Sequence, residues 1–462
     1  MKSPNTEPLA PLPRDPGQAL APYRPEKGQG PWDARTAAHL LRRALGGEAP
    51  ARVARFVKLG AGKAVADLFR PRDPERESLW ARLGRSLSLE DRGDLAGWWL
   101  MKLAQDRRAP GTRLTLFWHD HFACALSKVK NLPALFQQHQ LFVEKGEGPF
   151  EELVLGVVRD PAMLHFLDCD SNRRGRPNEN LSREMMELFT LGVGHYTEKD
   201  IKEAARALTG YAAREGRFLF VPENHDPRPK RVLGTEIQNG EDFCRQAVAQ
   251  KACPQFLAGK LWRWYVSPEP PKGTIGLLAE RWREHGLETK WLVRTLLSSR
   301  AFFSAEAHRS LVKSPVDFTV GLTRTLGAKP DFKVLARACD AMGQRLFEPP
   351  GVQGWKGGEA WIHATAWIER VNFAARVARG DGSLTRAVEV ERLFPDALKN
   401  PHAALAELLQ VFLQSELSPA RRASLERSLF SEEYAGSPAP SPEVFFPSAA
   451  HAVLSLPEYH LA

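Results

Sequence analysis

Two carboxylates that could bind a cation or exchange protons lie three residues apart in residues 178–192. This segment predicts a helix that begins at Asn178 and ends at Gly192, because asparagine is a preferred N-cap and glycine a preferred C-terminal stop. At about 100° per residue, Glu184 falls inside the apolar arc of the helix, and Glu187 lies in the same sector. We therefore expect Glu184 to be nearly inaccessible to solvent, with Glu187 beside it.

Two buried carboxylates cannot both stay charged unless a cation, a metal or a shared proton compensates them. One interpretation is a structural cluster of ion pairs, with Arg183, Arg206 or Arg173 as the counter-charge. The other is a metal site or an acid–base site, and perturbed carboxylates occur in both kinds of cluster. The sequence leaves both open.

On the polar side of the next predicted helix, residues 197–209, we expect Glu203 to be exposed.

Two histidines flank an aspartate in residues 114–123, a segment that is apolar on every side of a helical wheel. A helix here is buried all round, which places His119, Asp120 and His121 inside the protein. In a helix His119 and His121 point about 200° apart, so at most one of them is expected to bind a given metal. The alternative is a core histidine whose ring nitrogens are satisfied by hydrogen bonds.

A polar turn at residues 222–230 combines acidic, imidazole and basic side chains. Its His225 and Asp226 could supply metal ligands, or a general base with the carboxylate that orients it. Lys230 could hold an anion. The alternative is a solvated hairpin turn, whose Asp-Pro step and two further prolines need no chemistry.

A further irregular loop, residues 342–361, is rich in glycine, proline and tryptophan. Gln344, Trp355 and Trp361 are candidates for the wall of a pocket. In the alternative interpretation the two tryptophans seal the core.

Helical periodicity dominates the chain that must position these residues. Apolar side chains recur at three- and four-residue spacing in residues 36–44, 51–69, 95–103, 150–158, 243–261, 275–297, 316–326 and 366–378. The exception is residues 217–234, where two short apolar runs flank a turn and predict a small β-hairpin or an irregular excursion. The expected fold is mainly α, with a single large irregular helical domain over residues 35–436. A Pro/Gly-rich extension, residues 1–34, precedes it, and a Pro/Ser-rich segment with a short docking end, residues 437–462, follows it.

Composition argues against several classes of protein. Lysine and arginine number 64 and aspartate and glutamate 55, a net charge of +9; the basic residues are scattered in pairs, so no nucleic acid is expected as a partner. The five cysteines include no CxxC pair, which argues against a disulfide framework and a thiolate zinc site. No apolar run approaches the roughly 18 to 20 residues of a membrane span. Residues 1–30 lack the apolar core of a secretory signal, so we expect a cytoplasmic protein.

Several of these segments, in this order, resemble a large bacterial family catalogued as domain of unknown function eighteen hundred. The motifs are HLLRR at 39–43, WHDHF at 118–122, NENLSREMMEL at 178–188, residues 198–211, His225-Asp226 with Lys230, VKSP at 312–315, MGQ at 342–344, GW at 354–355 and LPEY at 456–459. The resemblance implies that the first three chemical segments converge on one site. Members are often exported and encoded beside a protein similar to sulfatases and alkaline phosphatases, which implies such a protein as a partner. This chain departs from the family in showing no leader and in carrying Arg228-Pro229 where members often have a glycine before the lysine.

The chemistry that these residues suit best is metal-assisted hydrolysis of a phosphorylated, sulfated or otherwise acidic small molecule or glycan. Mixed carboxylate and imidazole ligands favour zinc, manganese or iron. The candidate ligands are Glu184, Glu187, His119, His121 and His225. The candidate catalytic residues, which activate water or hold the anionic group, are Glu184, Glu187, His225, Asp226, Lys230 and Arg183. Two alternatives stay open: a non-catalytic binding or assembly protein with a structural polar cluster, and a metal-dependent oxidoreductase.

Overall fold

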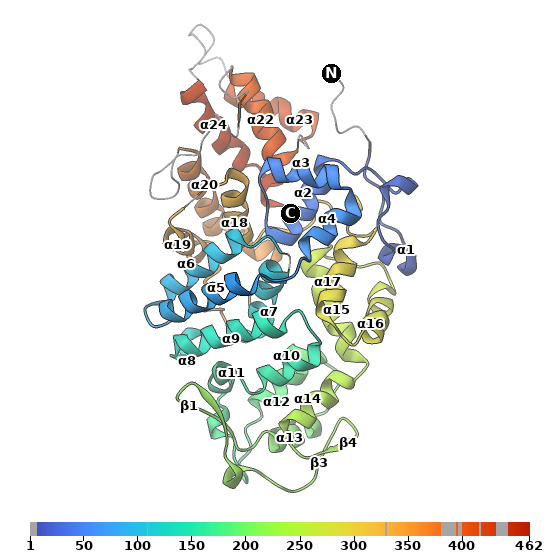
Figure 1. Cartoon of the computed structure of the whole chain (residues 1–462), viewed down its shortest axis with the longest axis vertical. Coiled ribbons are helices and arrows are strands. Elements are labelled where there is room, and N and C mark those ends of the chain that lie inside the picture. Colours follow the sequence, from blue (N-terminus) through green and yellow to red (C-terminus); the bar gives the residue numbers. More distant parts are fainter. Residues whose placement is uncertain are drawn as a thin grey trace.

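Helices make up most of the structure, a computed structural model that describes residues 7–108, 110–328, 330–379, 394–395, 400–414, 417–430 and 442–462. They are arranged along one long axis, with α22, α23 and α24 at the upper end and the strands at the lower end (Figure 1). The mainly α fold expected from the periodicity is confirmed.

The elements follow one another in a fixed order. In the first half they are α1 (Pro16–Leu20), η1 (Pro25–Lys27), α2 (Ala34–Leu45), α3 (Pro50–Leu59), α4 (Ala61–Leu68), α5 (Pro74–Leu87), α6 (Arg92–Gln105), η2 (Pro110–Leu114), α7 (Thr115–His121), α8 (Leu126–Val129), α9 (Leu132–Lys145), α10 (Phe150–Val157), α11 (Pro161–Phe166), η3 (Cys169–Ser171), α12 (Asn180–Glu184), η4 (Met185–Thr190) and α13 (Glu198–Ala207). The strands β1 (Tyr211–Arg214), β2 (Arg217–Phe220), β3 (Lys230–Val232) and β4 (Thr235–Ile237) come next, with η5 (Pro222–Asn224) between β2 and β3. The second half contains α14 (Gly240–Ala249), α15 (Ala252–Tyr265), α16 (Thr274–Glu284), α17 (Thr289–Ser298), α18 (Pro315–Leu326), α19 (Phe332–Ala341), η6 (Gly358–Trp361), α20 (Ala364–Ala378), α22 (Pro401–Leu413), α23 (Pro419–Leu429), α24 (Pro442–Leu454) and η8 (Pro457–His460). Of the short elements, η2 and η4 are π-helices and the others are 3₁₀-helices.

Three of the predicted helical segments are each divided into two helices. Gly60, with φ +76°, separates α3 from α4, and Gly286, with φ +64°, lies between α16 and α17. Residues with a Cβ rarely adopt this left-handed conformation, so glycine permits the sharp change of direction. A short break also separates α14 from α15. Periodicity locates apolar faces well, but it does not register a break that leaves the apolar spacing intact.

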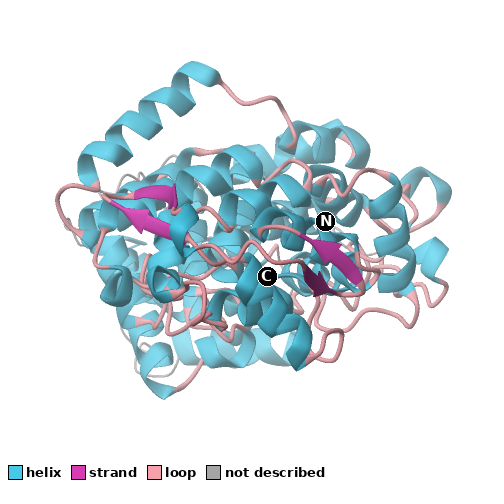
Figure 2. Ribbon diagram, turned by 90° about the horizontal axis from the view of Figure 1, so that it is seen from below, coloured by secondary structure: helices cyan, strands magenta, loops and turns pink. Residues whose placement is uncertain are grey.

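Two separate hairpins replace the single one expected in residues 217–234. β1 pairs with β2, and β3 pairs with β4, both antiparallel. Figure 2, viewed from the end that carries the strands, shows the two pairs well apart. The tight turns are Glu215-Gly216 and Leu233-Gly234, and all four of these residues have positive φ. Such two-residue turns suit the twist of a hairpin, so each apolar run pairs across its adjacent turn rather than with the other run.

One continuous cluster of buried apolar side chains extends from α1 to η8. The segment before α2 packs against this core, where the buried Tyr23 stacks on Phe303. At the other end, Leu461 forms an antiparallel bridge with Val312, so the short C-terminal end docks back on the fold. Residues 431–441, which include the start of the predicted Pro/Ser-rich segment, lie outside the described part. Within the described residues no helix is long and apolar enough to cross a membrane.

Candidate functional site

The helix predicted around Glu184 is present, but it changes type midway. α12 gives way after Glu184 to the π-helix η4, and the chain turns at Gly192, where φ is +80°. Glu179, not Asn178, is the N-cap residue, and Asn178 Oδ1 accepts the N–H of Asn180 at 2.9 Å. The hydrogen bonds of a π-helix join residues five apart, so a step of 100° per residue does not hold beyond Glu184. The predicted placement of Glu184 among the apolar side chains that follow it is therefore wrong.

Glu184 and Glu187 form a pair of carboxylates at the junction of α12 and η4. Both side chains are partly exposed, which corrects the expectation that Glu184 is nearly inaccessible. Burial and the charge of Glu187 raise the pKa of Glu184 above its usual range. Tyr196 Oη donates a hydrogen bond to Glu187 Oε2 at 2.8 Å. No described residue donates a hydrogen bond to the carboxylate of Glu184.

The arginines expected as counter-charges for this pair bind other carboxylates. The ion pairs are Arg183 with Glu179 and Glu198, and Arg206 with Glu203 and Asp226. Arg173 is exposed. Because Arg206 covers Glu203, that carboxylate is partly buried rather than exposed as predicted. Among the described residues no basic side chain forms an ion pair with Glu184.

Both histidines of the second segment are buried in α7, as predicted, and His119 has a structural environment. His119 Nε2 accepts the backbone N–H of Phe347 at 3.1 Å, and its ring packs against the rings of Trp99, Phe347 and Trp355. Burial lowers the pKa of His119 to about 3, so the imidazole is neutral. Its acceptor nitrogen, the one a metal would need, is already used.

His121 points away from His119 and meets a lysine on α15. His121 Nδ1 lies 2.8 Å from Nζ of Lys260, and Nε2 lies 3.1 Å from the carbonyl oxygen of Phe189 on η4. This geometry is satisfied when Nδ1 accepts from the ammonium and Nε2–H donates to the carbonyl. Burial and the charge of Lys260 lower the pKa of His121 and keep its ring neutral.

Asp120, between the two histidines, is held by the loop that follows α19. The backbone N–H of Trp355 donates to Asp120 Oδ1 at 2.7 Å. A Cβ on Gly354 would lie 2.3 Å from that oxygen and 2.4 Å from the Asp120 carbonyl oxygen. The absence of a side chain at Gly354 therefore lets the loop reach the carboxylate. The indole of Trp355 packs against the ring of His119 on α7, with 5.7 Å between the ring centroids.

We name Asp120, His121, Lys260 and Trp355 the Asp120–Lys260 site. Asp120 and Lys260 are each partly exposed. Burial raises the pKa of Asp120 to about 6, against the opposing effects of the Trp355 N–H and of Lys260. Burial also lowers the pKa of Lys260 to about 8, against the attraction of Asp120. A carboxyl group and an amine that both titrate near neutral pH can exchange protons with a bound molecule.

Asp226 forms a different kind of cluster with two arginines. It is buried, and its Oδ2 lies 2.7 Å from Arg228 and 2.9 Å from Arg206. The hydrogen bonds from these two guanidinium groups hold the pKa of Asp226 well below its usual range. A carboxylate held this firmly in its ionised form is a poor proton acceptor.

The other two candidates of the third segment, His225 and Lys230, surround Asp226 and also have partners in the fold. His225 Nδ1 lies 2.8 Å from the carbonyl oxygen of Thr209. Lys230 is buried and donates to the carbonyl oxygen of Gln238 at 2.7 Å, with His225 Nε2 at 3.4 Å. Burial lowers the pKa of Lys230. We name Asp226, Arg206, Arg228, His225 and Lys230 the Asp226 cluster; it fastens the hairpin region to the end of α13.

The three predicted segments do not share one set of contacts. Among the described residues, no hydrogen bond or ion pair joins Glu184 or Glu187 to the α7 histidines or to His225, and no group of three or more His, Cys, Asp or Glu side chains could hold a metal ion. The first two segments meet at η4, the helix that carries Glu187. His121 Nε2 bonds to the carbonyl oxygen of Phe189, and the ring of Phe189 packs against the rings of His121 and Phe122.

Lys260 is a candidate that the sequence analysis missed. It lies within the apolar part of α15, between the buried residues Leu257 and Leu261. A lysine within such an apolar stretch is a local signal that something inside the protein compensates its charge. Nothing local identifies the partner, because His121 is 139 residues away in the chain.

Over residues 39–461 the chain matches the family model described as protein of unknown function (DUF1800). The chain therefore belongs to this family, as its motifs indicate. Neither a curated protein nor a solved structure matches it.

Proposed function

We propose that this member of the DUF1800 family is a hydrolase for an acidic substrate and that the Asp120–Lys260 site performs its acid–base chemistry. The proposal is supported by the contacts that hold Asp120 and Lys260 in one site, with the N–H of Trp355 on Asp120 and His121 on Lys260. There burial raises the pKa of Asp120 to about 6 and lowers the pKa of Lys260 to about 8. Near pH 7 the pair is a carboxylate beside an ammonium, and each group is close to changing its protonation state. Side chains with such pKa values suit general acid–base catalysis at neutral pH.

In the proposed mechanism each residue of the site has one task. Asp120 accepts a proton from the attacking water through Oδ2, because Oδ1 is held by the N–H of Trp355, and returns it to the leaving oxygen as the bond from that oxygen to the acidic group breaks. The ammonium of Lys260 holds the acidic group of the substrate, and His121 positions that ammonium by accepting one of its hydrogens. With its pKa far below neutral, His121 does not itself donate a proton.

The metal-dependent form of the proposal places zinc, manganese or iron on Glu184 and Glu187. His119 and His121 do not complete this ligand set, because the acceptor nitrogen of each is used inside the protein. The described residues also contain no group of three or more His, Cys, Asp or Glu side chains placed to hold an ion. The described residues therefore do not complete a metal site, and no step of the proposed mechanism uses one.

The test is hydrolysis of chromogenic phosphate, sulfate and acidic-sugar substrates by the purified chain. Asp120→Asn and Lys260→Met should each lower kcat at least about 100-fold, the contribution typical of an acid–base group. Lys128→Met is the matched control, because its ammonium forms an exposed pair with Asp168 at 2.8 Å. Thermal unfolding verifies that the variants fold.

Full activity in Asp120→Asn would overturn the assignment of the site. A wild-type chain that hydrolyses none of these substrates would favour the alternative class, a binding or assembly protein. The family resemblance then directs the next measurement to a protein similar to sulfatases and alkaline phosphatases, tested for co-purification with this chain.

A further inference from the structure

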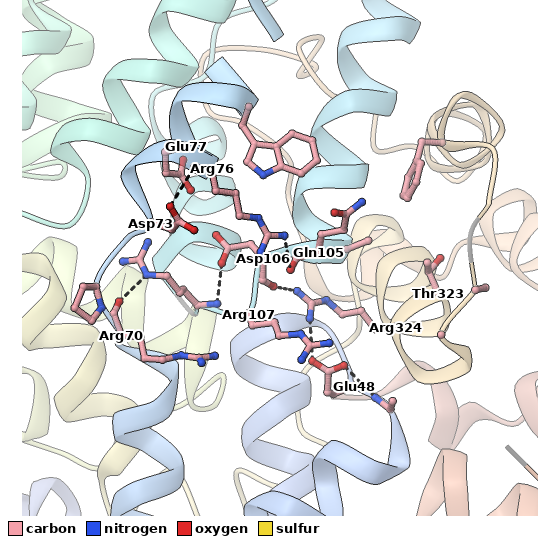
Figure 3. A pocket seen from close by; sticks show the side chains of 18 residues that line it. Glu48, Arg70, Asp73, Arg76, Glu77, Gln105, Asp106, Arg107, Thr323 and Arg324 are labelled. Carbon is pink, nitrogen blue, oxygen red and sulfur yellow. Dashed lines mark hydrogen bonds and ion pairs between the residues drawn. The ribbon is translucent and has the colours of Figure 1, made fainter. Parts of the chain in front are cut away.

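A polar cleft lies between α5, the end of α6 and the region joining α18 to α19 (Figure 3). Its volume is about 830 Å³, and none of the residues of the Asp120–Lys260 site or the Asp226 cluster lines it. Five of the lining side chains are arginines: Arg70, Arg76, Arg107, Arg108 and Arg324. We name it the arginine-lined cleft.

Three guanidinium groups gather around one carboxylate at this cleft. Arg52 and Arg324 both bind Glu48 Oε2, at 2.6 and 3.0 Å. The charge of Arg107 acts on both of them and lowers the pKa of each. Burial, with these two neighbouring arginines, lowers the pKa of Arg324 to about 10. Arg52 also pairs with Asp67, at 3.4 Å, whereas no described carboxylate forms an ion pair with Arg107.

The other carboxylates that line the cleft form hydrogen bonds or ion pairs with groups of the surrounding helices and loops. Glu77 binds Lys102 at 2.9 Å, and Asp73 caps the N-terminus of α5. Asp106 accepts the backbone N–H of Arg108 at 2.9 Å. Burial raises the pKa of Asp106, which favours its neutral form. Glu77 therefore pairs with a cation, whereas neither Asp73 nor Asp106 forms an ion pair with the exposed arginines at the opening.

Three arginines at the opening are exposed: Arg70, Arg76 and Arg107. The Arg107 side chain forms no hydrogen bond or ion pair with any described residue, and Arg76 binds only the uncharged carbonyl of Gln105, at 3.2 Å. Figure 3 shows Arg76, Arg107 and Arg324 extending from different elements into the same region. The lining also includes the aromatic side chains of Trp80 and Phe332.

We propose that the arginine-lined cleft binds a small molecule with two or more phosphoryl groups, of the class of pyrophosphate or a nucleoside diphosphate. Guanidinium groups bind phosphate oxygens through paired, charge-assisted hydrogen bonds. Two exposed arginines without carboxylate partners match a ligand with at least two negative charges. The volume lies within the range of ligand pockets and exceeds what a single phosphate needs. The aromatic side chains provide an apolar wall for a nucleobase.

The test is isothermal titration of the full chain with pyrophosphate, ADP and orthophosphate. Pyrophosphate and ADP should bind at least about tenfold more tightly than orthophosphate, with an affinity that falls as salt rises. Arg76→Ala and Arg107→Ala should each weaken binding of both probes about tenfold. Equal affinities for the two probes assign an inorganic polyphosphate, whereas tighter binding of ADP assigns a nucleotide.

Arg217→Ala is the matched control for these variants. Arg217 is exposed on β2, and its side chain forms no hydrogen bond or ion pair with the described residues. Its substitution removes the same single charge, but at the end of the molecule that carries the strands. Its affinity for both probes should equal that of the wild type. The proposal is overturned if neither probe binds, or if Arg217→Ala weakens binding as much as Arg107→Ala does. Because all three arginines are exposed, folding of the variants is expected and is verified by thermal unfolding.

Discussion

An aspartate, a histidine and a lysine meet at two places in this molecule, with opposite electrostatic results. At the Asp120–Lys260 site the carboxylate has one backbone N–H and one neighbouring ammonium, and its pKa rises to about 6. In the Asp226 cluster two guanidinium groups bind the carboxylate, and its pKa is held well below the usual range. Asp226 is nevertheless the less exposed of the two aspartates.

The comparison shows that solvent exposure alone does not set the direction in which the pKa of an aspartate moves. The number of hydrogen-bonded positive charges decides whether desolvation or ion pairing controls the pKa. A fully paired aspartate stabilises the fold, whereas an under-compensated one costs stability and is available for proton transfer. The two sites should therefore respond to neutralisation with changes of opposite sign.

The largest effect is expected for Asp226→Asn. The variant leaves Arg228 without a carboxylate and Arg206 with Glu203 alone, so the free energy of unfolding at pH 7 should fall by roughly 2 to 4 kcal/mol. The loss stays below that of a fully buried pair because 67% of the Arg228 side chain is exposed. Urea unfolding measures it. An unchanged denaturation midpoint would show that the ion pairs of Asp226 with the two arginines do not stabilise the folded chain.

Asp120→Asn should have the opposite sign. The pKa of Asp120 in the folded chain, about 6, lies above the roughly 3.9 of an unfolded aspartate, so wild-type stability falls as pH rises from about 4 to about 6. The variant lacks this loss and should be more stable than the wild type by about 1 to 3 kcal/mol at pH 7, but not at pH 4. Urea unfolding at both pH values tests the sign; a loss at pH 7 would place Asp120 among the structural carboxylates.

A smaller effect is expected where the loop approaches Asp120. Gly354→Ala places a Cβ 2.3 Å from Asp120 Oδ1 and imposes a side chain on a residue with φ +74°. Gly343→Ala is the matched control, because its φ is +96° and nothing lies within 4 Å of the added Cβ. Both variants should lose stability through backbone strain, and Gly354→Ala should lose about 1 to 2 kcal/mol more. Equal losses in urea unfolding would mean that the contact with Asp120 imposes no constraint.

The sequence predicted the helical fold because apolar periodicity is a local property of the chain. It also predicted the burial of His119 and His121, since α7 is apolar all round. The placement of Glu184 failed because the periodicity argument assumed one helix type across the start of η4. The pairing of Lys260 with His121 lay beyond local reasoning, because it depends on how α15 and α7 pack.

The hairpin region shows the same limit at the level of secondary structure. The sequence pattern predicts one hairpin from two apolar runs, but each run lies next to a turn that ends in glycine and pairs with a nearer strand. The turns Glu215-Gly216 and Leu233-Gly234, each ending in glycine, are the local features that separate the two hairpins. The polar residues between them then belong to a connection, which is where the Asp226 cluster forms.

The smallest effect separates the metal-free proposal from its metal-dependent form. Glu184→Gln removes the repulsion between Glu184 and Glu187, three residues apart in one helical segment, and should raise stability by a few tenths of a kcal/mol in chelator. Thermal unfolding is then repeated with added zinc or manganese.

Glu223→Gln is the control for non-specific loss of charge, because Glu223 is an exposed glutamate on η5. If Asp120 and Lys260 carry the chemistry without a metal, the melting temperatures of wild type, Glu184→Gln and Glu223→Gln should respond alike to the ions. A rise in wild type and Glu223→Gln that is absent from Glu184→Gln would assign the ion to the glutamate pair, because a ligand that binds only the folded chain raises its melting temperature.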